Sequence, residues 1–199
     1  MNDANNPPSY YVLEKEPIGD LRDLAVLGRR PMIPGIDFMA GERFDPTIAI
    51  PQPLRYELNP EAPGEMPWFF KAGGPLMHDR MVEALRAAGV DNIDVYDALV
   101  VDPDDGSEWT DYKAVNIVGL VAAADMTKSI IDTSDSARLI TTKFEKLVLD
   151  PAKAHGLLLF RLAEKVSAII VHERVKAEIE ARKIGPLGFI PPEKWFGAI

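Results

Sequence analysis

Prolines are concentrated in the first third of the chain, where 11 of the 17 precede residue 68. Proline has no backbone N–H and a fixed φ, so it interrupts helices and the hydrogen-bond ladders of sheets. We therefore expect residues 1–67 to form a Pro-rich extended arm with few regular elements, among them short strands at Tyr10–Leu13 and Leu54–Leu58. Apolar residues recur along this arm, which predicts that it packs against a core formed by residues 68–199.

After residue 68 the sequence alternates between strand-like and helix-like segments. Met77–Ala88 has apolar residues at helical spacing and is followed by Gly89, which is typical of a helix and its left-handed stop. Asp105-Gly106 marks the turn of a β-hairpin. The other expected elements are strands at Trp68–Phe70, Ile93–Val101, Asp111–Val118 and Leu157–Phe160, strand-like segments within Leu139–Leu149, and a helical turn within Ala122–Ile131.

A short motif occurs twice in the chain. Residues 76–81 (Leu-Met-His-Asp-Arg-Met) correspond to residues 170–175 (Ile-Val-His-Glu-Arg-Val), and apolar positions after them also match. The shared His-acid-Arg tripeptide favours an internal strand–helix–strand duplication over chance similarity between two amphipathic helices. The predicted fold class is α+β: a single domain in which one mixed or antiparallel sheet carries two amphipathic helices from this duplication, preceded by the Pro-rich arm.

The composition is that of a folded, acidic protein. The hydrophobic fraction of 47% is ordinary for a globular chain, and the formal net charge is -9. Phosphate recognition needs clustered Lys and Arg, so this charge disfavours nucleic acid and anionic membranes as partners. It fits a basic protein partner, or solubility alone. The absence of cysteine excludes disulfides, thiolate nucleophiles and cysteine-ligated zinc.

The sequence carries no visible targeting or membrane signal. Met1–Tyr10 has neither the basic nor the apolar part of a secretory signal peptide. The longest apolar run, Val118–Ala124, is too short to cross a bilayer. We therefore expect a cytoplasmic protein, and nothing in the sequence indicates a homo-oligomer.

The chain has three histidines, and none lies four residues from another as in helical zinc motifs. His78 and His172 occupy matching positions at the starts of the two predicted helices. They could form a metal site or an acid–base pair. We favour the simpler interpretation, in which each histidine starts its helix and makes a local hydrogen bond. The sequence thus predicts no metal site and no cofactor.

An acidic segment from Asp102 to Asp111 surrounds the predicted hairpin turn. A calcium-binding loop starting at Asp102 would have Gly at its sixth position and Glu at its twelfth, whereas Gly106 is fifth and Lys113 is twelfth. A solvated hairpin tip is the simplest interpretation. A protein-binding tip is the functional alternative, because carboxylates around an aromatic side chain are typical of binding hot spots. The candidate binding residues are Asp104, Asp105, Glu108, Trp109 and Asp111.

No motif of a known catalytic chemistry is present. The Gly-Gly-Pro segment after Lys71 lacks the Gly-Lys-Ser/Thr of a phosphate loop, and Pro75 removes a backbone donor that a phosphate would need. No Gly-x-Ser-x-Gly nucleophile elbow occurs. Near the C-terminus, Trp195 and Phe196 are expected to anchor the last residues by packing.

Four parts of the chain between Phe69 and Trp195 carry a family resemblance. They are Leu76–Val95; Leu99–Gly106 with Asp111-Tyr112, Val115-Asn116 and Gly119–Val121; Leu147–Asp150; and Leu159–Ala163 with Val171–Arg174 and Phe189–Trp195. In order and spacing they resemble family eleven of the immunity proteins from bacterial polymorphic toxin systems. The chain departs from the family pattern at His78 and His172, where family members commonly have a small hydroxyl residue.

The resemblance implies a non-catalytic protein that neutralises a cognate protein toxin by binding it. Toxins that act in the cytosol often attack nucleic acid, and such nucleases have basic clefts. Electrostatic attraction would steer an acidic partner to such a cleft, which it would then occlude. The five candidate residues at the hairpin tip would contact the toxin. Two other functions stay open: an enzyme with a dispersed active site, and a small-ligand-binding module.

Overall fold

The computed structural model describes residues 9–20, 22–71, 74–132 and 142–196. The helices are α1 (Asp79–Ala87) and α2 (Glu173–Ala181), with short 3-10 helices η1 (Pro151–Ala154) and η2 (Pro192–Lys194). The strands are β1 (Tyr10–Glu14), β2 (Leu27–Arg29), β3 (Leu54–Leu58), β4 (Phe69–Phe70), β5 (Leu76–His78), β6 (Ile93–Val101), β7 (Glu108–Ile117), β8 (Leu120–Val121), β9 (Ile130–Ile131), β10 (Phe144–Lys146), β11 (Leu159–Leu162), β12 (Lys165–His172) and β13 (Gly188–Ile190).

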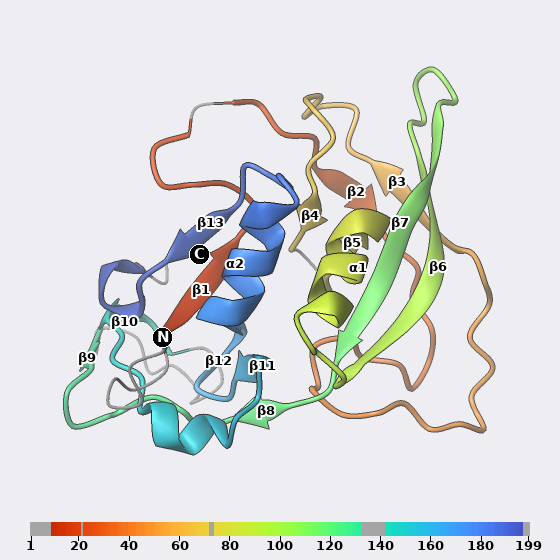
Figure 1. Cartoon of the computed structure of the whole chain (residues 1–199). Helices are drawn as coiled ribbons and strands as arrows, with labels where there is room; N and C mark the ends of the chain where they lie inside the picture. The colour runs from red at the N-terminus through yellow and green to blue at the C-terminus, as the bar shows by residue number, and fades with distance from the viewer. Residues whose placement is uncertain (1–8, 21, 72–73, 133–141, 197–199) are drawn as a thin grey trace.

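The strands form two main sheets and one small one (Figure 1). A six-stranded sheet has the order β2-β3-β6-β7-β5-β4, and a five-stranded sheet has the order β13-β1-β12-β11-β8. Both are mixed, because β3 runs parallel to β6 and β8 runs parallel to β11. Strands β9 and β10 pair separately. The predicted α+β class is confirmed, although the two strand–helix–strand units lie on two sheets and not on one.

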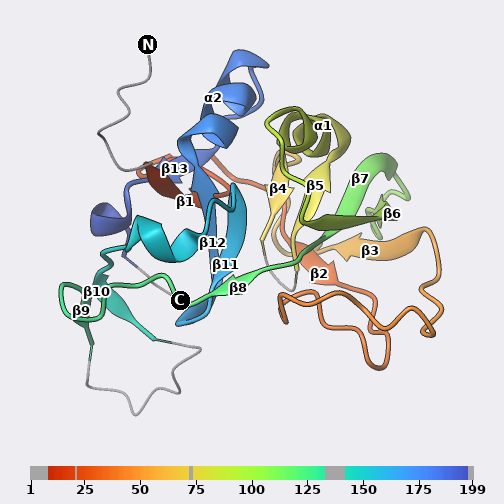
Figure 2. The same cartoon turned by 60° about the horizontal axis from the view of Figure 1, so that its bottom comes forward.

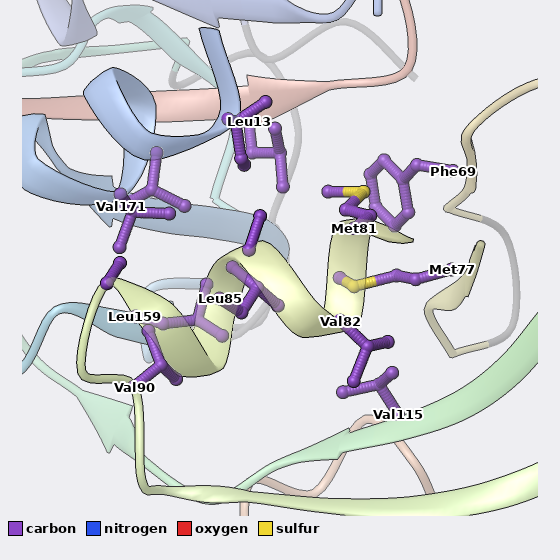
Figure 3. Packing of buried hydrophobic residues seen from close by; sticks show 14 of the residues in the cluster. Leu13, Phe69, Met77, Met81, Val82, Leu85, Val90, Val115, Leu159 and Val171 are labelled. Carbon is purple, nitrogen blue, oxygen red and sulfur yellow. The ribbon is translucent and has the colours of Figure 1, made fainter. Parts of the chain in front are cut away.

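One hydrophobic core joins the two sheets. Helices α1 and α2 lie side by side in both views (Figures 1 and 2) and contact each other. Met81 and Leu85 of α1 are fully buried in a cluster that also contains Leu13 of β1, Phe69 of β4 and Val171 of β12 (Figure 3). Burying each such side chain stabilises the fold by about 1.5–3 kcal/mol. Because this cluster includes residues of both sheets and both helices, the chain folds as a single domain.

The two helices have matching surroundings. In one half, β7 lies between β5, which precedes α1, and β6, which follows it. In the other half, β1 lies between β12, which precedes α2, and β13, which follows it. All these neighbours are antiparallel. The halves therefore share a local arrangement, while their origin by duplication stays a prediction.

Several predicted boundaries shift because of strand pairing. The helix predicted from Met77 begins at Asp79, since residues 76–78 form β5 between β4 and β7. The strand expected from Asp111 begins three residues earlier, at Glu108. The helical turn expected within Ala122–Ile131 is present as a single turn, in which Ser129 N–H donates to the Asp125 carbonyl at 2.8 Å, and it leads into β9. The start of the segment predicted at Leu139–Leu149 lies outside the described residues, and β10 occupies part of the rest.

The N-terminal 67 residues contribute strands to both sheets. β1 lies between β12 and β13, and β3 lies between β2 and β6. The segment between β2 and β3 has no regular element and packs through Ile33, Phe38 and Ile50 on the six-stranded sheet. The buried guanidinium of Arg161 in β11 ties this segment to the other half, because its Nη2 donates to the Phe38 carbonyl at 3.1 Å. A boundary between arm and core at residue 67 stays a prediction.

Candidate functional site

The hairpin of β6 and β7 projects beyond α1 at one end of the molecule (Figure 1). Its tip is closed by two backbone hydrogen bonds. Asp102 N–H donates to the Ser107 carbonyl at 2.9 Å, and Gly106 N–H donates to the Asp102 carbonyl at 3.0 Å. Gly106 has a φ of 77°, a left-handed conformation that glycine adopts without strain. The Asp-Gly turn expected from the sequence therefore forms and fixes the tip.

The tip carries carboxylates that face solvent. Asp104, Asp105 and Glu108 are exposed, and none of them forms an ion pair with another described residue. The Asp105 carboxylate accepts a hydrogen bond from the Ser107 backbone N–H at 2.8 Å. This bond, reinforced by the Ser107 side chain, lowers the pKa of Asp105 below its usual value. The tip is therefore a concentration of uncompensated negative charge at neutral pH.

Trp109 and residues of the hairpin tip line a cavity of about 250 Å³. The ring is half-buried and packs on the hydrophobic cluster of the six-stranded sheet. The opposite wall comes from the segment that follows β3. The cavity is lined by Ala25, Leu58, Asn59, Pro60, Ala62, Pro63, Gly64, Met66, Asp102, Asp104, Asp105, Ser107 and Trp109.

The five candidate residues divide into three positions. Asp104, Asp105 and Trp109 line the cavity together. Glu108 lies on the same hairpin but does not line the cavity. Asp111 lies beside the start of α1, where its Oδ2 is 3.2 Å from Nε2 of His78. The structure therefore brings three candidates into one recess and separates the other two from it.

The two matching histidines cap the two helices. Nδ1 of His78 accepts a hydrogen bond from the Arg80 backbone N–H at 3.2 Å, and Nδ1 of His172 accepts one from Arg174 at 3.1 Å. Because Nδ1 is the acceptor, the neutral His78 ring carries its proton on Nε2 and donates it toward Asp111. The predicted local hydrogen bonds at the helix starts are confirmed.

The surroundings of His172 keep its ring neutral. Burial lowers the pKa of His172 below its usual value, which favours the neutral ring that a helix cap requires. Within the part of the chain that the structure describes, no three His, Asp or Glu side chains gather as metal ligands.

The C-terminal anchor consists of one aromatic residue and not two. Trp195 is 5% exposed, and its Nε1 donates to the Glu14 carboxylate at 2.8 Å. Lys71 Nζ lies 2.5 Å from the same carboxylate oxygen. Phe196 is 71% exposed, so the prediction that it packs is wrong. The indole can satisfy its N–H inside the fold, and this contact holds the chain end against β1.

Sequence reasoning missed the second wall of the cavity. Residues 58–66 carry prolines and Gly64, which indicate a turn, and two glutamates, but no motif that marks a binding site. They reach the hairpin because β3 pairs in parallel with β6, with Tyr56 opposite Val100. This pairing is a tertiary property, so no local pattern in the sequence indicates the recess.

No helix among the described residues is both long enough and apolar enough to cross a bilayer. No curated protein matches the chain. A family model described as the Imm11 immunity protein family matches residues 25–194, which include both helices and the hairpin tip. This match extends the resemblance seen between Phe69 and Trp195 into the segments before it. The chain therefore belongs to the Imm11 family of immunity proteins.

Proposed function

We propose that this protein neutralises a cognate toxin by binding it and occluding its active cleft, without catalysing a reaction. The observation that carries the proposal is the β6–β7 hairpin, which projects from the fold and bears unpaired carboxylates beside Trp109. Aromatic anchors with charged neighbours are typical of binding hot spots. Membership of an immunity family supplies the class of partner.

The proposed toxin is a basic nuclease that acts in the cytosol. An enzyme that binds nucleic acid has a cleft lined by Lys and Arg, to which a protein of net charge -9 is attracted. Such attraction raises the association rate constant, up to about 10⁸–10⁹ M⁻¹s⁻¹ at low salt, and the effect weakens as salt screens the charges. The carboxylates at the hairpin tip would be the first groups to approach the basic cleft.

The test compares charge removal at the tip with equal charge removal elsewhere. The tip variant is Asp104→Asn, Asp105→Asn and Glu108→Gln. The matched control is Glu83→Gln, Asp91→Asn and Glu193→Gln, which are exposed and form no ion pair with another described residue. Association with the cognate toxin, which is first sought among the products of neighbouring genes, is measured by stopped flow over a range of salt concentrations, and neutralisation is measured by co-expression.

The tip variant is expected to associate more slowly than the control and to show a weaker dependence on salt. Equal slowing of both variants would mean that only net charge matters and would reject the assigned interface. Asp111→Asn is measured separately, because Asp111 contacts His78 and its loss also changes the start of α1. If co-expressed wild-type protein does not protect cells from that toxin, the neutralisation function itself is wrong.

A further inference from the structure

We propose that the cavity between the hairpin tip and residues 58–66 receives the guanidinium group of an arginine side chain from the toxin. This inference rests on the proposed function, since the toxin supplies the arginine. The cavity lies between two chain segments that are far apart in sequence, with Trp109 on one wall and Met66 on the other. Its size, charge and rigidity each point to this occupant.

The size of the cavity fits one side chain. Its volume is about 250 Å³. Sites for whole small molecules usually occupy about 300–1,000 Å³ and enclose most of the ligand. A recess below that range, which opens at the end of a projecting hairpin, suits a side chain that enters from another protein surface.

The negative charge of the lining residues favours a positively charged occupant. Asp102, Asp104 and Asp105 all line the cavity, and no Lys, Arg or His is among its lining residues. Asp102 and Asp105 each accept a local backbone N–H through Oδ1, at 2.9 and 2.8 Å. The Asp104 carboxylate accepts no hydrogen bond from a described residue. The lining thus offers several acceptors and no positive group to balance them.

The aromatic wall favours arginine over other cations. A guanidinium group is planar and weakly hydrated, so it stacks on an aromatic ring and still donates along its edge to carboxylates. Trp gives the strongest cation–π attraction among the aromatic side chains. A metal ion would instead need several oxygen ligands around one point, and the apolar side chains of Leu58, Met66 and Trp109 occupy much of this lining.

Both walls are held in place before any partner binds. Ala25 N–H donates to the Glu65 carbonyl at 2.9 Å, and Asn59 N–H donates to the Val26 carbonyl at 2.7 Å. These bonds tie residues 58–66 to the preceding segment, while Trp109 is fixed opposite Val100 in the hairpin. A pre-organised recess loses little entropy on binding, which favours recognition of a single side chain.

The test uses the ¹⁵N-labelled full chain and a small arginine probe. Nα-acetyl-arginine amide is titrated while the Trp109 indole N–H resonance is followed, with Trp109→Phe identifying that resonance. Nα-acetyl-citrulline amide, which has a similar shape without the charge, is the control probe. The cavity variant is Asp104→Asn with Asp105→Asn, in which the amide oxygen introduced by the second change can still accept the Ser107 N–H. Glu108→Gln removes a charge from the same hairpin outside the cavity.

We expect the arginine probe to shift the Trp109 resonance with saturation, and the citrulline probe to leave it unchanged. The cavity variant should bind at least about tenfold more weakly, because charge-assisted hydrogen bonds are lost, while Glu108→Gln should bind like wild type. The inference is overturned if the resonance does not move, if citrulline is equivalent, or if Glu108→Gln matches the cavity variant.

The toxin assay separates this inference from the proposed function. Arginine binding at Trp109 without protection against the toxin would retain the cavity assignment and reject neutralisation. Protection that depends on the tip carboxylates, without any response to the arginine probe, would retain neutralisation and reject the cavity assignment.

Discussion

The imidazole of His78 lies edge-on to the ring of Tyr112, which is its direct partner in the register of β5 and β7, with ring centroids 5.6 Å apart. His172 has the same relationship to Tyr10 in β1, at 5.2 Å. The hydroxyl of Tyr112 donates to the carbonyl of Pro67, just before β4. The Tyr10 hydroxyl donates to the carbonyl of Leu157. Each capping histidine therefore contacts the ring of a tyrosine whose hydroxyl also binds a neighbouring chain segment.

The first prediction concerns the Tyr112 hydroxyl. Its hydrogen bond to Pro67 is 2.7 Å long, and the side chain is 2% exposed. Tyr112→Phe leaves the carbonyl without this donor, so we expect a loss of about 1–2 kcal/mol of unfolding free energy. Thermal unfolding measures the effect. Tyr11→Phe is the control, because the Tyr11 hydroxyl forms no hydrogen bond with another described residue, and it should change the melting temperature little.

The equivalent hydroxyl in the other half gives the second prediction. Tyr10 donates to the Leu157 carbonyl at 3.1 Å and is 6% exposed. Because this bond is longer, Tyr10→Phe should cost less than Tyr112→Phe, at about 1 kcal/mol. Chemical denaturation of both variants tests the order. A larger cost for Tyr10→Phe would show that the two contacts are not equivalent in the way that their geometry indicates.

The third prediction is a pH-dependent helix cap at His172. Burial lowers the pKa of His172, with Glu173 opposing and Arg174 reinforcing this shift. The unfolded chain therefore takes up a proton at a higher pH than the folded chain, so stability falls as pH drops below about 6.5, the ordinary histidine pKa. Protonation also removes the Nδ1 acceptor for the Arg174 N–H.

His172→Asn keeps a capping acceptor and removes the titration, whereas His172→Ala removes both. At pH 7.5 the alanine variant should lose about 1 kcal/mol and the asparagine variant less. Between pH 7 and pH 5 wild type should lose stability relative to the asparagine variant. Parallel pH profiles for these two proteins would contradict a titrating cap.

The fourth prediction concerns the buried guanidinium of Arg161. Burial lowers its pKa to about 10, so it stays charged at neutral pH, and it donates to the carbonyls of Val166 and Phe38. Removing a buried charge can stabilise a fold, but here two carbonyls would lose their donor. We expect Arg161→Met to cost about 2 kcal/mol, since the lost hydrogen bonds outweigh the relief of burying a cation.

Loss of the Phe38 contact should also loosen the segment between β2 and β3. Limited proteolysis of Arg161→Met should therefore cut within residues 30–50 faster than wild type under native conditions. Arg86→Met, an exposed change on α1, is the control. Unchanged cleavage in a destabilised Arg161 variant would mean that the segment is held by its apolar contacts alone.

Local patterns are enough to predict the strands at Leu54–Leu58 and Ile93–Val101, with the boundaries that the structure has. Both are bordered by turn residues and rich in apolar side chains. The predicted start of α1 is wrong because the apolar pair Leu76-Met77 fits both the spacing of a helix and that of a strand. Only its pairing with β4 and β7 makes it a strand. The strand at Lys165–His172 is not predicted, because its second half overlaps the repeated motif, which we interpret as the start of a helix.

The candidate site is less predictable than the fold. The acidic hairpin tip follows from Asp105-Gly106, but a break in register between Ala98 and Val100 places two residues of β7 against one of β6. This irregularity separates Asp111 from Trp109 and brings Asp111 to His78. A register shift depends on contacts between strands, so it cannot be predicted from composition and spacing along one strand.

The last prediction tests how the cavity wall is held. A Cβ added at Gly64 would lie 2.4 Å from the Asp23 carbonyl oxygen and 2.7 Å from the Ala25 nitrogen, both backbone atoms. Gly64→Ala must therefore push residues 58–66 away from the preceding segment, at a cost of about 1–3 kcal/mol for overpacking. The displaced wall should weaken the response of the Trp109 resonance to the arginine probe.

Gly156→Ala is the matched control, because Gly156 has a φ of 79° and no atom within 4 Å of the added Cβ. It should cost about 1–2 kcal/mol through backbone strain alone and leave the Trp109 response unchanged. Denaturant unfolding and the arginine titration are measured on both variants. If Gly64→Ala loses stability and still binds the probe as wild type does, the wall formed by residues 58–66 is not needed for arginine recognition.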